Sequence, residues 1–181
     1  MEIEKISLPG VLIIKPNLFS DNRGYFYESF QQIRYEKLGI PQFIQDNVSS
    51  SKQNVLRGLH YQLPYTQGKL VWVGRGTVYD VIVDLRLSSP TFGKWFSILL
   101  TDKEHLQMYV PPGFAHGFCV ISPEADFYYK CTDYYMPQAE NGIIWDDANL
   151  NINWPVKNPI LSPKDKKFPS LHEISHEKLF A

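Results

Sequence analysis

Apolar and polar positions alternate in short runs along most of the chain. In residues 77–86, Val81, Val83 and Leu85 alternate with polar residues, and this period of two predicts a strand with one buried and one exposed face. Similar runs predict further strands over residues 8–15, 25–28, 42–50, 94–101, 106–110, 118–121, 126–131 and 143–145, and within 53–73. Turn signals separate the runs at intervals of about 8 to 12 residues, as in β-sandwiches and β-barrels. The pattern predicts an all-β fold.

Helical periodicity is confined to one segment. Residues 31–38 have a convincing helical pattern, and Gly39 ends it. No internal repeat, low-complexity segment or linker stands out, so we expect a single domain over residues 1–181. Its last part, residues 155–181, is polar and broken by prolines, and we expect it to wrap around the outside of the barrel.

Composition and charge narrow the class of protein. Of the 181 residues, 44% are hydrophobic and 14% aromatic, as in a globular protein with a substantial core. The formal net charge of −1 gives no electrostatic footprint for nucleic acid. No apolar run approaches the roughly 18 residues of a membrane span, and the N-terminus lacks signal-peptide features. With only Cys119 and Cys131 as cysteines, we expect a soluble cytoplasmic protein without nucleic-acid or membrane partners.

The most informative stretch is residues 53–73, where Arg57, His60, Gln62 and Lys69 stand among apolar residues. In a strand, His60 and Gln62 point to the same face, whereas Arg57 joins them only if Gly58 forms a bulge. Lys69 can reach back toward His60 across a short turn. A satisfied core histidine with a snorkelling arginine and lysine is the structural alternative. The clustering of four polar groups favours a functional site.

A second candidate segment is Pro111-Pro112-Gly113-Phe114-Ala115-His116-Gly117-Phe118. The pattern Pro-x-Gly-x-x-His resembles the second half-motif of the cupin barrels, whose first half-motif normally carries His-x-His. Here the first half-motif reads His60-Tyr61-Gln62. Because a metal site needs about three protein ligands and a neutral Gln is a poor one, we expect no metal.

Three later segments carry polar groups that also have ordinary explanations. Residues 172–176 match His-Glu-x-x-His, but their charged flanks and the lack of a third ligand indicate a chance match to a zinc motif. The tyrosines in residues 128–137, with Glu140 beyond them, are also consistent with an ordinary strand whose phenol groups reach solvent. Asp165 follows late in a loop, where a lone carboxylate is expected on the surface.

Taken in order, these pieces resemble the family of dTDP-4-dehydrorhamnose 3,5-epimerases, which are deoxysugar-nucleotide epimerases of the cupin superfamily. The resemblance runs from about residue 5 to 171 and leaves residues 172–181 outside. The stretches that carry it are residues 21–28, 45–47, 55–62, 67–71, 80–86, 89–95, 113–118, 129–135 and 161–165. Several of these motifs are long.

The resemblance implies a metal-free, cupin-type double-stranded β-helix (jelly roll) with a few short helices. It implies a homodimer that needs no cofactor and acts on a nucleotide sugar, dTDP-4-dehydro-6-deoxy-D-glucose. The C4 ketone of this substrate makes the hydrogens at C3 and C5 acidic. The expected reaction removes each proton, forms an enolate and returns a proton on the opposite face, which gives dTDP-4-dehydro-L-rhamnose for dTDP-L-rhamnose biosynthesis.

The resemblance also implies roles for individual residues. His60 is expected to be the base, Asp165 its orienting carboxylate, and Tyr129 the acid. Lys69 is expected at the C4 oxygen, and Tyr135 on the thymine ring. The expected substrate-binding residues are Arg23, Glu28, Gln45, Asn47, Arg57, Gln62, Lys69, His116, Tyr135, Glu140 and Lys164. Of these, Arg23 and Glu28 belong to N-terminal strands (about residues 1–50) that can be exchanged across a dimer.

Three alternatives remain open from the sequence. Relatives that invert only C3 or only C5 share these residues. A non-catalytic sugar-nucleotide-binding cupin would keep the pocket, although a binder needs no acid and base on opposite faces. A metal-dependent cupin oxygenase, or a zinc hydrolase using His172 and His176, is the third.

Overall fold

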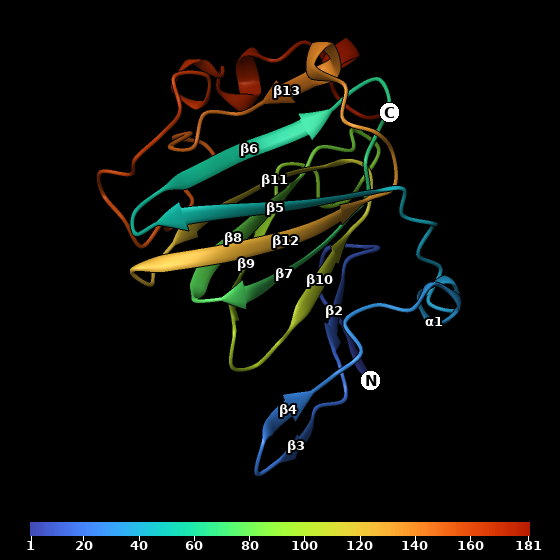
Figure 1. Ribbon diagram of the computed structural model, residues 1–181. Coiled ribbons are helices and arrows are strands. Elements are labelled where there is room, and N and C mark those ends of the chain that lie inside the picture. The colour runs from blue at the N-terminus through green and yellow to red at the C-terminus, as the bar shows by residue number, and fades with distance from the viewer.

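The computed structural model describes residues 1–181 as two large β-sheets packed face to face, with a small hairpin standing apart (Figure 1). The strands are β1 (Glu2–Lys5), β2 (Leu12–Lys15), β3 (Phe19–Asp21), β4 (Gly24–Phe26), β5 (Gln45–Lys52), β6 (Leu56–Gln62), β7 (Lys69–Arg75), β8 (Thr77–Asp84), β9 (Trp95–Thr101), β10 (Gln107–Val110), β11 (Phe114–Val120), β12 (Glu124–Cys131) and β13 (Glu140–Gly142). One sheet has the order β1-β2-β10-β7-β12-β5, and the other β13-β6-β11-β8-β9. Neighbouring strands in them run antiparallel. The predicted all-β, cupin-type fold is confirmed.

Helices contribute little to the fold. The single α-helix, α1 (Gln32–Glu36), begins where the Gln31 side chain accepts a hydrogen bond from the Arg34 N–H at 2.9 Å. It is shorter than predicted, and Gly39 follows it in the left-handed region at φ +81°. The 3₁₀ turns are η1 (Pro137–Ala139), η2 (Asp165–Lys167), η3 (Leu171–Glu173) and η4 (His176–Lys178). No helix is long and apolar enough to cross a membrane.

The main apolar core lies between the two large sheets. Val71 and Phe127 of one sheet pack with Ile82 and Phe118 of the other, and the Phe118 and Phe127 rings stack with their centroids 4.1 Å apart. A second apolar cluster joins the C-terminal segment to the outer face of the five-stranded sheet. A third packs Tyr35 of α1 against the six-stranded sheet. Parts of both sheets are therefore covered on both faces.

Strand β8 departs from the predicted alternation of buried and exposed faces. Val81 and Val83 are buried as predicted, but Asp80 and Asp84 are 0% exposed as well. Residues 143–181 cover the face that carries the valines, while the two carboxylates accept hydrogen bonds inside the protein. The prediction of an exposed polar face was wrong because it did not foresee this interior polar chemistry.

Several strand boundaries also differ from those predicted. Strand β11 begins at Phe114, earlier than expected, because it pairs with β8 from Val78 to Asp84. The predicted strand at residues 143–145 is not formed, although Ile143 still exchanges backbone hydrogen bonds with Leu59 at the end of β13. Strands β1 and β3 were not predicted. Their residues are all exposed, so they leave no alternating pattern in the sequence.

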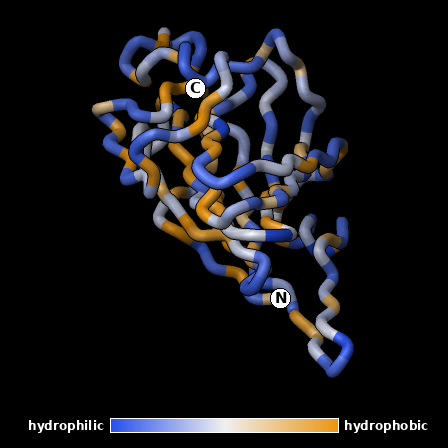
Figure 2. The backbone as a smooth tube through the Cα atoms, turned by 60° about the vertical axis from the view of Figure 1, so that its left-hand side comes forward, coloured by the Kyte–Doolittle hydropathy of each residue, from blue (hydrophilic) through white to orange (hydrophobic).

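The β3–β4 hairpin extends away from the sandwich (Figure 1). Its tip is hydrophilic, whereas hydrophobic segments gather in the sandwich (Figure 2). Phe19, Tyr25 and Phe26 on this hairpin are each more than half exposed. Large exposed aromatic side chains on one projecting element are typical of an interaction surface.

Candidate active site

A cavity of about 930 Å³ opens between the two sheets. Its wall is formed by side chains of β5, β6, β7, β11 and β12, together with Tyr135, Glu140 and the loop at residues 160–165. The cavity contains most of the polar residues that the sequence singled out. This size is in the range of small-molecule binding sites.

A β-bulge in β6 aligns two of these residues. His60 lies opposite His116, whereas Arg57 lies opposite Phe118, so β6 has one extra residue between the two pairs. Gly58 sits in the bulge at φ +127°, and a Cβ there would come within 2.5 Å of Gly117 Cα. The glycine is thus required, and the bulge that was the condition for Arg57 to join His60 is present. Arg57 and His60 both line the cavity.

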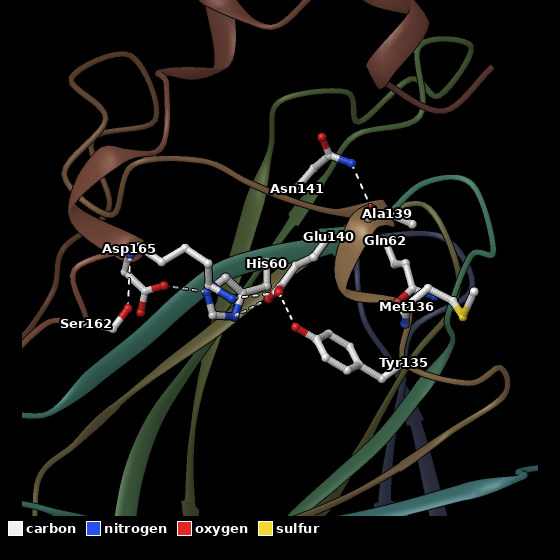
Figure 3. A network of polar contacts seen from close by, with 10 residues as sticks. His60, Gln62, Tyr135, Met136, Ala139, Glu140, Asn141, Ser162 and Asp165 are labelled. Atoms are coloured by element: carbon white, nitrogen blue, oxygen red, sulfur yellow. Dashed lines mark hydrogen bonds and ion pairs between the residues drawn. The ribbon is translucent and has the colours of Figure 1, made fainter.

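His60 and Asp165 form a close pair on the cavity wall. Nε2 of His60 lies 2.7 Å from Oδ1 of Asp165, and the Asp165 N–H donates to Ser162 Oγ (Figure 3). Burial opposes ionisation of Asp165, but the hydrogen bond and charge of His60 hold the pKa of this carboxyl below its usual range. Asp165 is only 2% exposed, so the expectation from its loop position, a surface carboxylate, was wrong. The packing of η2 against β6 brings it inward.

Glu140 is hydrogen-bonded to two further candidate residues, Tyr135 and Lys164, and it approaches the His60 ring on the side opposite Asp165. Its Oε2 accepts hydrogen bonds from Tyr135 Oη and Lys164 Nζ, both at 2.6 Å, and its Oε1 lies 3.9 Å from His60 Nδ1 (Figure 3). Burial works against the charge of Glu140, yet the bonds from Lys164 and Tyr135 lower its pKa. The same bond to Glu140 raises the pKa of Tyr135 to about 12. His60 therefore has a carboxylate on each side.

Lys69 and Tyr129 line the same cavity from β7 and β12. Lys69 has no carboxylate within ion-pair distance, and burial lowers its pKa, although the negative charges of Glu140 and Asp80 partly oppose that shift. Burial raises the pKa of Tyr129, which keeps its phenol protonated near neutral pH. The Lys69 amine and a protonated phenol thus face the cavity that holds the His60–Asp165 pair.

Gln62 is engaged by the backbone of a neighbouring loop. Its Nε2 donates to the carbonyl oxygens of Tyr65 and Tyr134, and its Oε1 accepts from the Met136 N–H at 2.8 Å. The side chain borders the cavity but is only 4% exposed. Its hydrogen-bonding groups hold the loop that leads to Tyr135.

Asp80 is a polar partner that the sequence reasoning missed. Both of its carboxylate oxygens lie 3.0 Å from Nε2 of His116, which lines the cavity from β11. Burial raises the pKa of Asp80, and the charge of His116 opposes this rise. The alternating pattern had placed Asp80 on an exposed face, so no sequence signal connected the two residues.

Gln45, Asn47 and Arg57 border another part of the cavity. Gln45 donates to Asn47 Oδ1 at 3.0 Å and accepts from the Tyr135 N–H at 2.8 Å. Arg57 Nε donates to Ser51 Oγ at 3.1 Å. Ser49 also lines the cavity, and the sequence reasoning missed both serines. Both serines continue the alternation along β5 that begins with Gln45 and Asn47, and this alternation was the sequence signal that could have identified them.

Arg23 and Glu28 lie away from the cavity within this chain. Arg23 pairs with Asp21 at the tip of the β3–β4 hairpin, with its side chain 86% exposed. Glu28 pairs with Arg34 at 3.1 Å. Neither residue borders the cavity formed by the same chain.

The His-Glu-x-x-His segment does not form a zinc-binding helix. His172 and His176 lie on separate 3₁₀ turns, η3 and η4, and His172 is hydrogen-bonded to Asn149 and Ser170. No group of three or more His, Cys, Asp or Glu side chains in the molecule is arranged to hold a metal ion. In the two cupin half-motifs, His60 and His116 are hydrogen-bonded to carboxylates, and Gln62 is hydrogen-bonded to backbone groups.

Solved structures with the same fold define the class. The chain superimposes with a TM-score of 0.96 on dTDP-6-deoxy-D-glucose-3,5-epimerase from Legionella pneumophila in complex with dTDP-4-keto-L-rhamnose, at 50% identity over 99% of this chain and 97% of that one. A more distant match is a 3′-monoepimerase from Streptomyces bikiniensis in complex with dTDP-quinovose, with a TM-score of 0.87 and 32% identity over 92% and 86% of the two chains. The fold is that of a deoxysugar-nucleotide epimerase.

Sequence comparison gives the family itself. The family model for dTDP-4-dehydrorhamnose 3,5-epimerase matches residues 5–173. The chain is 53% identical over 168 residues to dTDP-4-dehydrorhamnose 3,5-epimerase of Shigella flexneri, covering 91% of this chain and 93% of the relative. The chain belongs to the dTDP-4-dehydrorhamnose 3,5-epimerase family, which confirms the resemblance inferred from its motifs.

Proposed function

We propose that this chain converts dTDP-4-dehydro-6-deoxy-D-glucose to dTDP-4-dehydro-L-rhamnose, without a cofactor, as a step of dTDP-L-rhamnose biosynthesis. The observation that carries the proposal is the 2.7 Å pair of His60 and Asp165 on the wall of the cavity. The C4 ketone of the substrate acidifies the hydrogens on both neighbouring carbons. A single base can therefore remove the proton at C3 to form one enolate. After the sugar repositions, the same base can remove the proton at C5 to form a second enolate.

His60 is the base in this proposal. When Nε2 carries the proton shared with Asp165, Nδ1 is unprotonated and can accept a proton from the substrate. The Asp165 carboxylate fixes this tautomer and stabilises the imidazolium that forms. The lowered pKa of Asp165 keeps the carboxylate charged throughout the neutral pH range.

Lys69 and Tyr129 complete the proposed chemistry. The ammonium group of Lys69 donates to the C4 oxygen, where negative charge develops, and one such donor is typically worth about 3–4 kcal/mol of the barrier. Tyr129 returns the proton on the face opposite His60. Its raised pKa supports this role, because an acid must hold its proton until the enolate forms.

The remaining cavity residues bind the nucleotide sugar in this proposal. Tyr135 stacks on the thymine ring, and its bonds to Gln45 and Glu140 hold the phenol and backbone in place. Gln62 contributes by fixing the loop that carries Tyr135. The other binding residues of the same chain are Asn47, Arg57, His116 and Lys164.

Arg23 and Glu28 act in the cavity of a second copy of the chain in this proposal. The hairpin that carries Arg23 extends away from the sandwich and exposes aromatic side chains (Figure 1). The part exchanged in a homodimer would thus be the β3–β4 hairpin and the residues up to Glu28, because β2 and β5 pair with β10 and β12 of their own chain. Each cavity would receive charged groups from its partner. We also place the reaction in the cytoplasm, because both cysteines are free and buried.

Inversion of a single carbon is the second candidate function. The Streptomyces bikiniensis 3′-monoepimerase matches this chain over most of its length, so a shared fold does not fix the number of inverted carbons. A non-catalytic sugar-nucleotide binder has less support. It would not need a phenol with a raised pKa and a His–carboxylate pair in one cavity.

Proton NMR of the substrate in D₂O, with and without the protein, tests the proposal. We expect deuterium to enter at C3 and C5, and both carbons to invert. The variant His60→Asn should abolish deuterium uptake at both carbons, because one base serves both. Uptake at a single carbon would favour the monoepimerase alternative. Continued uptake in His60→Asn at a near-native rate would show that another residue is the base.

A further inference from the structure

The segment that joins the β3–β4 hairpin to α1, residues 27–30, is held to its own chain by side chains. No backbone–backbone hydrogen bond is formed by these four residues. Tyr27 and Phe30 pack their rings against the body of the protein. The carbonyl oxygen of Ser29 accepts a hydrogen bond from the Gln107 side chain of β10. The direction in which the hairpin leaves the sandwich therefore depends on these side-chain contacts.

The amide of Gln107 uses both of its ends on this part of the chain, although the residue is 0% exposed. Its Nε2 donates to the Ser29 carbonyl oxygen at 2.6 Å, and its Oε1 accepts from Tyr35 Oη at 2.5 Å. The Tyr35 Oη also lies 3.3 Å from the same carbonyl oxygen. Burial raises the pKa of Tyr35 to about 12, so its phenol keeps the proton that it donates. An amide and a phenol thus hold one carbonyl group.

Packing alone does not require an amide at position 107. Gln107 lies opposite Ile14 of β2 and Trp72 of β7 in the six-stranded sheet, so its neighbours on this face are an aliphatic and an aromatic side chain. A buried amide costs free energy unless its groups are hydrogen-bonded, whereas an apolar residue of similar size would fill the same space. Apolar burial is non-directional, but two hydrogen bonds fix the place of the group they hold. The amide therefore adds direction.

The carbonyl that Gln107 holds is next to Glu28. The Glu28 carboxylate pairs with Arg34 of α1 at 3.1 Å, and both side chains are partly exposed. Beyond it, β3 and β4 form a two-stranded sheet that pairs with no other strand (Figure 1). Arg23, at the tip, has a side chain that is 86% exposed. Ser29 is thus the point nearest to Glu28 at which the backbone is hydrogen-bonded to the sandwich.

We propose that Gln107, together with Tyr35, is a positioning residue for the cavity of a second copy of the chain. The two side chains fix the segment from which Glu28 and the hairpin reach into that cavity. The proposal rests on the hairpin exchange proposed above and adds the element that directs it. Neither residue lines the cavity of its own chain. Removal of the amide therefore weakens substrate binding in the partner's cavity and spares the cavity of the same chain.

Steady-state turnover of dTDP-4-dehydro-6-deoxy-D-glucose tests the first part of this proposal. Gln107→Met replaces the amide by an apolar side chain of similar size. Its KM should rise about tenfold, as expected for one lost charge-assisted contact, with kcat within about twofold. Tyr35→Phe leaves the bond between Gln107 and Ser29 intact and should raise KM less. Ile14→Val, which removes a methyl group beside Gln107, is the control and should leave KM unchanged.

Mixed dimers test whether the effect is exerted on the other chain. A His60→Asn chain and a Gln107→Met chain are coexpressed with different affinity tags and purified over both. In the mixed dimer the only cavity with a base belongs to the Gln107→Met chain, and it receives its hairpin from the chain with an intact amide. We expect the KM of the unmodified protein and half of its kcat per dimer. A KM that stays raised, or a chain that forms no dimer, would overturn the proposal.

Thermal unfolding separates positioning from general stability. Equal rises in KM for Gln107→Met and Ile14→Val, in step with their falls in Tm, would show a merely structural amide and overturn the proposal. If Gln107→Met did not fold, Tyr35→Phe would take its place in the mixed dimer, where a KM unchanged in every combination would count against the proposal.

Failure of the epimerase reaction gives a different result from failure of this inference. Normal turnover with unchanged KM in Gln107→Met would sink this inference alone. Absence of turnover in the unmodified protein would sink the proposed reaction, and calorimetric titration with dTDP would then decide the inference. Gln107→Met should bind dTDP more weakly than Ile14→Val does, and equal affinities would overturn it.

Discussion

At the scale of single residues, the state of His60 is set by groups from distant parts of the chain. Asp165 contacts its Nε2 from a loop 105 positions away in the sequence, and Glu140 approaches its Nδ1 from β13. Close by in the sequence, Gly58 decides where the ring stands, because the bulge at this position sets the pairing of His60 with His116. The geometry of the base thus depends on one local backbone conformation and two distant carboxylates.

Gly58→Ala tests the local part of this arrangement. An added Cβ would lie 2.5 Å from Gly117 Cα and 2.9 Å from the His116 carbonyl oxygen, and the backbone there is at φ +127°. We expect a loss of about 2–4 kcal/mol in the free energy of unfolding, measured by urea denaturation, and a large loss of activity. Gly93→Ala is the control. Gly93 also has positive φ (+70°), but its nearest atom would be 3.9 Å away, so only about 1 kcal/mol should be lost. Equal losses in both would show that close packing at the bulge is unimportant.

Tyr129→Phe should separate proton removal from inversion. The change deletes one hydroxyl and leaves the ring to pack beside Phe127, so the fold should hold. His60 and Lys69 can still form the enolate, but no positioned acid returns a proton on the opposite face, a role usually worth 10²–10⁴-fold in rate. NMR in D₂O should show deuterium entering recovered substrate with far less inverted product. Unchanged inversion would assign the acid to another residue, with Tyr135 the next candidate.

At the scale of elements, the base of the β3–β4 hairpin is fixed by one histidine. The rings of Tyr25 and Tyr27 lie 4.6 and 4.8 Å from the ring of His105, which follows β9. His105 is 4% exposed and stands at φ +54°. Burial lowers its pKa, and the charge of Asp102 opposes that shift only partly. The attachment of the hairpin therefore favours a neutral imidazole.

Protonation of His105 should weaken this attachment in acid. Below a pH of about 6.5 the unfolded chain takes up a proton that the folded protein disfavours, so stability should fall as the pH is lowered. In His105→Asn, Tm measured by circular dichroism should be lower at pH 7.5 because the ring contacts are lost. Between pH 7 and 5, however, its Tm should decline less than that of the unmodified protein. His176→Asn, at an exposed histidine, should reproduce the unmodified decline. Parallel declines in all three proteins would exclude His105 as the cause.

At the scale of the whole molecule, the C-terminal segment completes both the core and the site. Ile174 and Leu179 are buried against the outer face of the five-stranded sheet, and Asp165 enters the cavity from the same segment. A polar, proline-rich sequence therefore supplies a large part of the cover of one sheet. The paired histidines at 172 and 176 stay on the outside of this segment.

Exhaustive treatment with EDTA should leave activity intact. His60 and His116 are each bonded to a carboxylate, and the amide of Gln62 holds backbone groups, so the cupin motif presents no free ligand set. Activity after chelation, with elemental analysis of the protein, measures this directly. Loss of turnover that one divalent ion restores would contradict it. The double variant His172→Ala, His176→Ala should stay within a few fold of full activity, and a collapse there would revive the zinc interpretation.

The sequence by itself determined the fold class and most of the candidate site. Short alternating runs and frequent turns predicted the all-β fold, because side chains in a strand alternate between faces. The mixture of Arg57, His60 and Lys69 with apolar residues marked the cavity, because buried polar groups need partners or a function. Gly58 indicated a possible bulge, because glycine is the favoured residue at such a position. These features depend on residues close together in the chain, which the sequence displays directly.

Only the tertiary structure decided which distant groups meet. Asp80 belongs by its pattern to an exposed face and Asp165 by its position to a surface loop, yet each is buried beside a histidine. Ser51 has the pattern of an ordinary strand residue, and only the folded structure shows that it accepts a hydrogen bond from Arg57. Burial and hydrogen-bond partners are set by the packing of two sheets and a long C-terminal segment, and no local pattern encodes that packing.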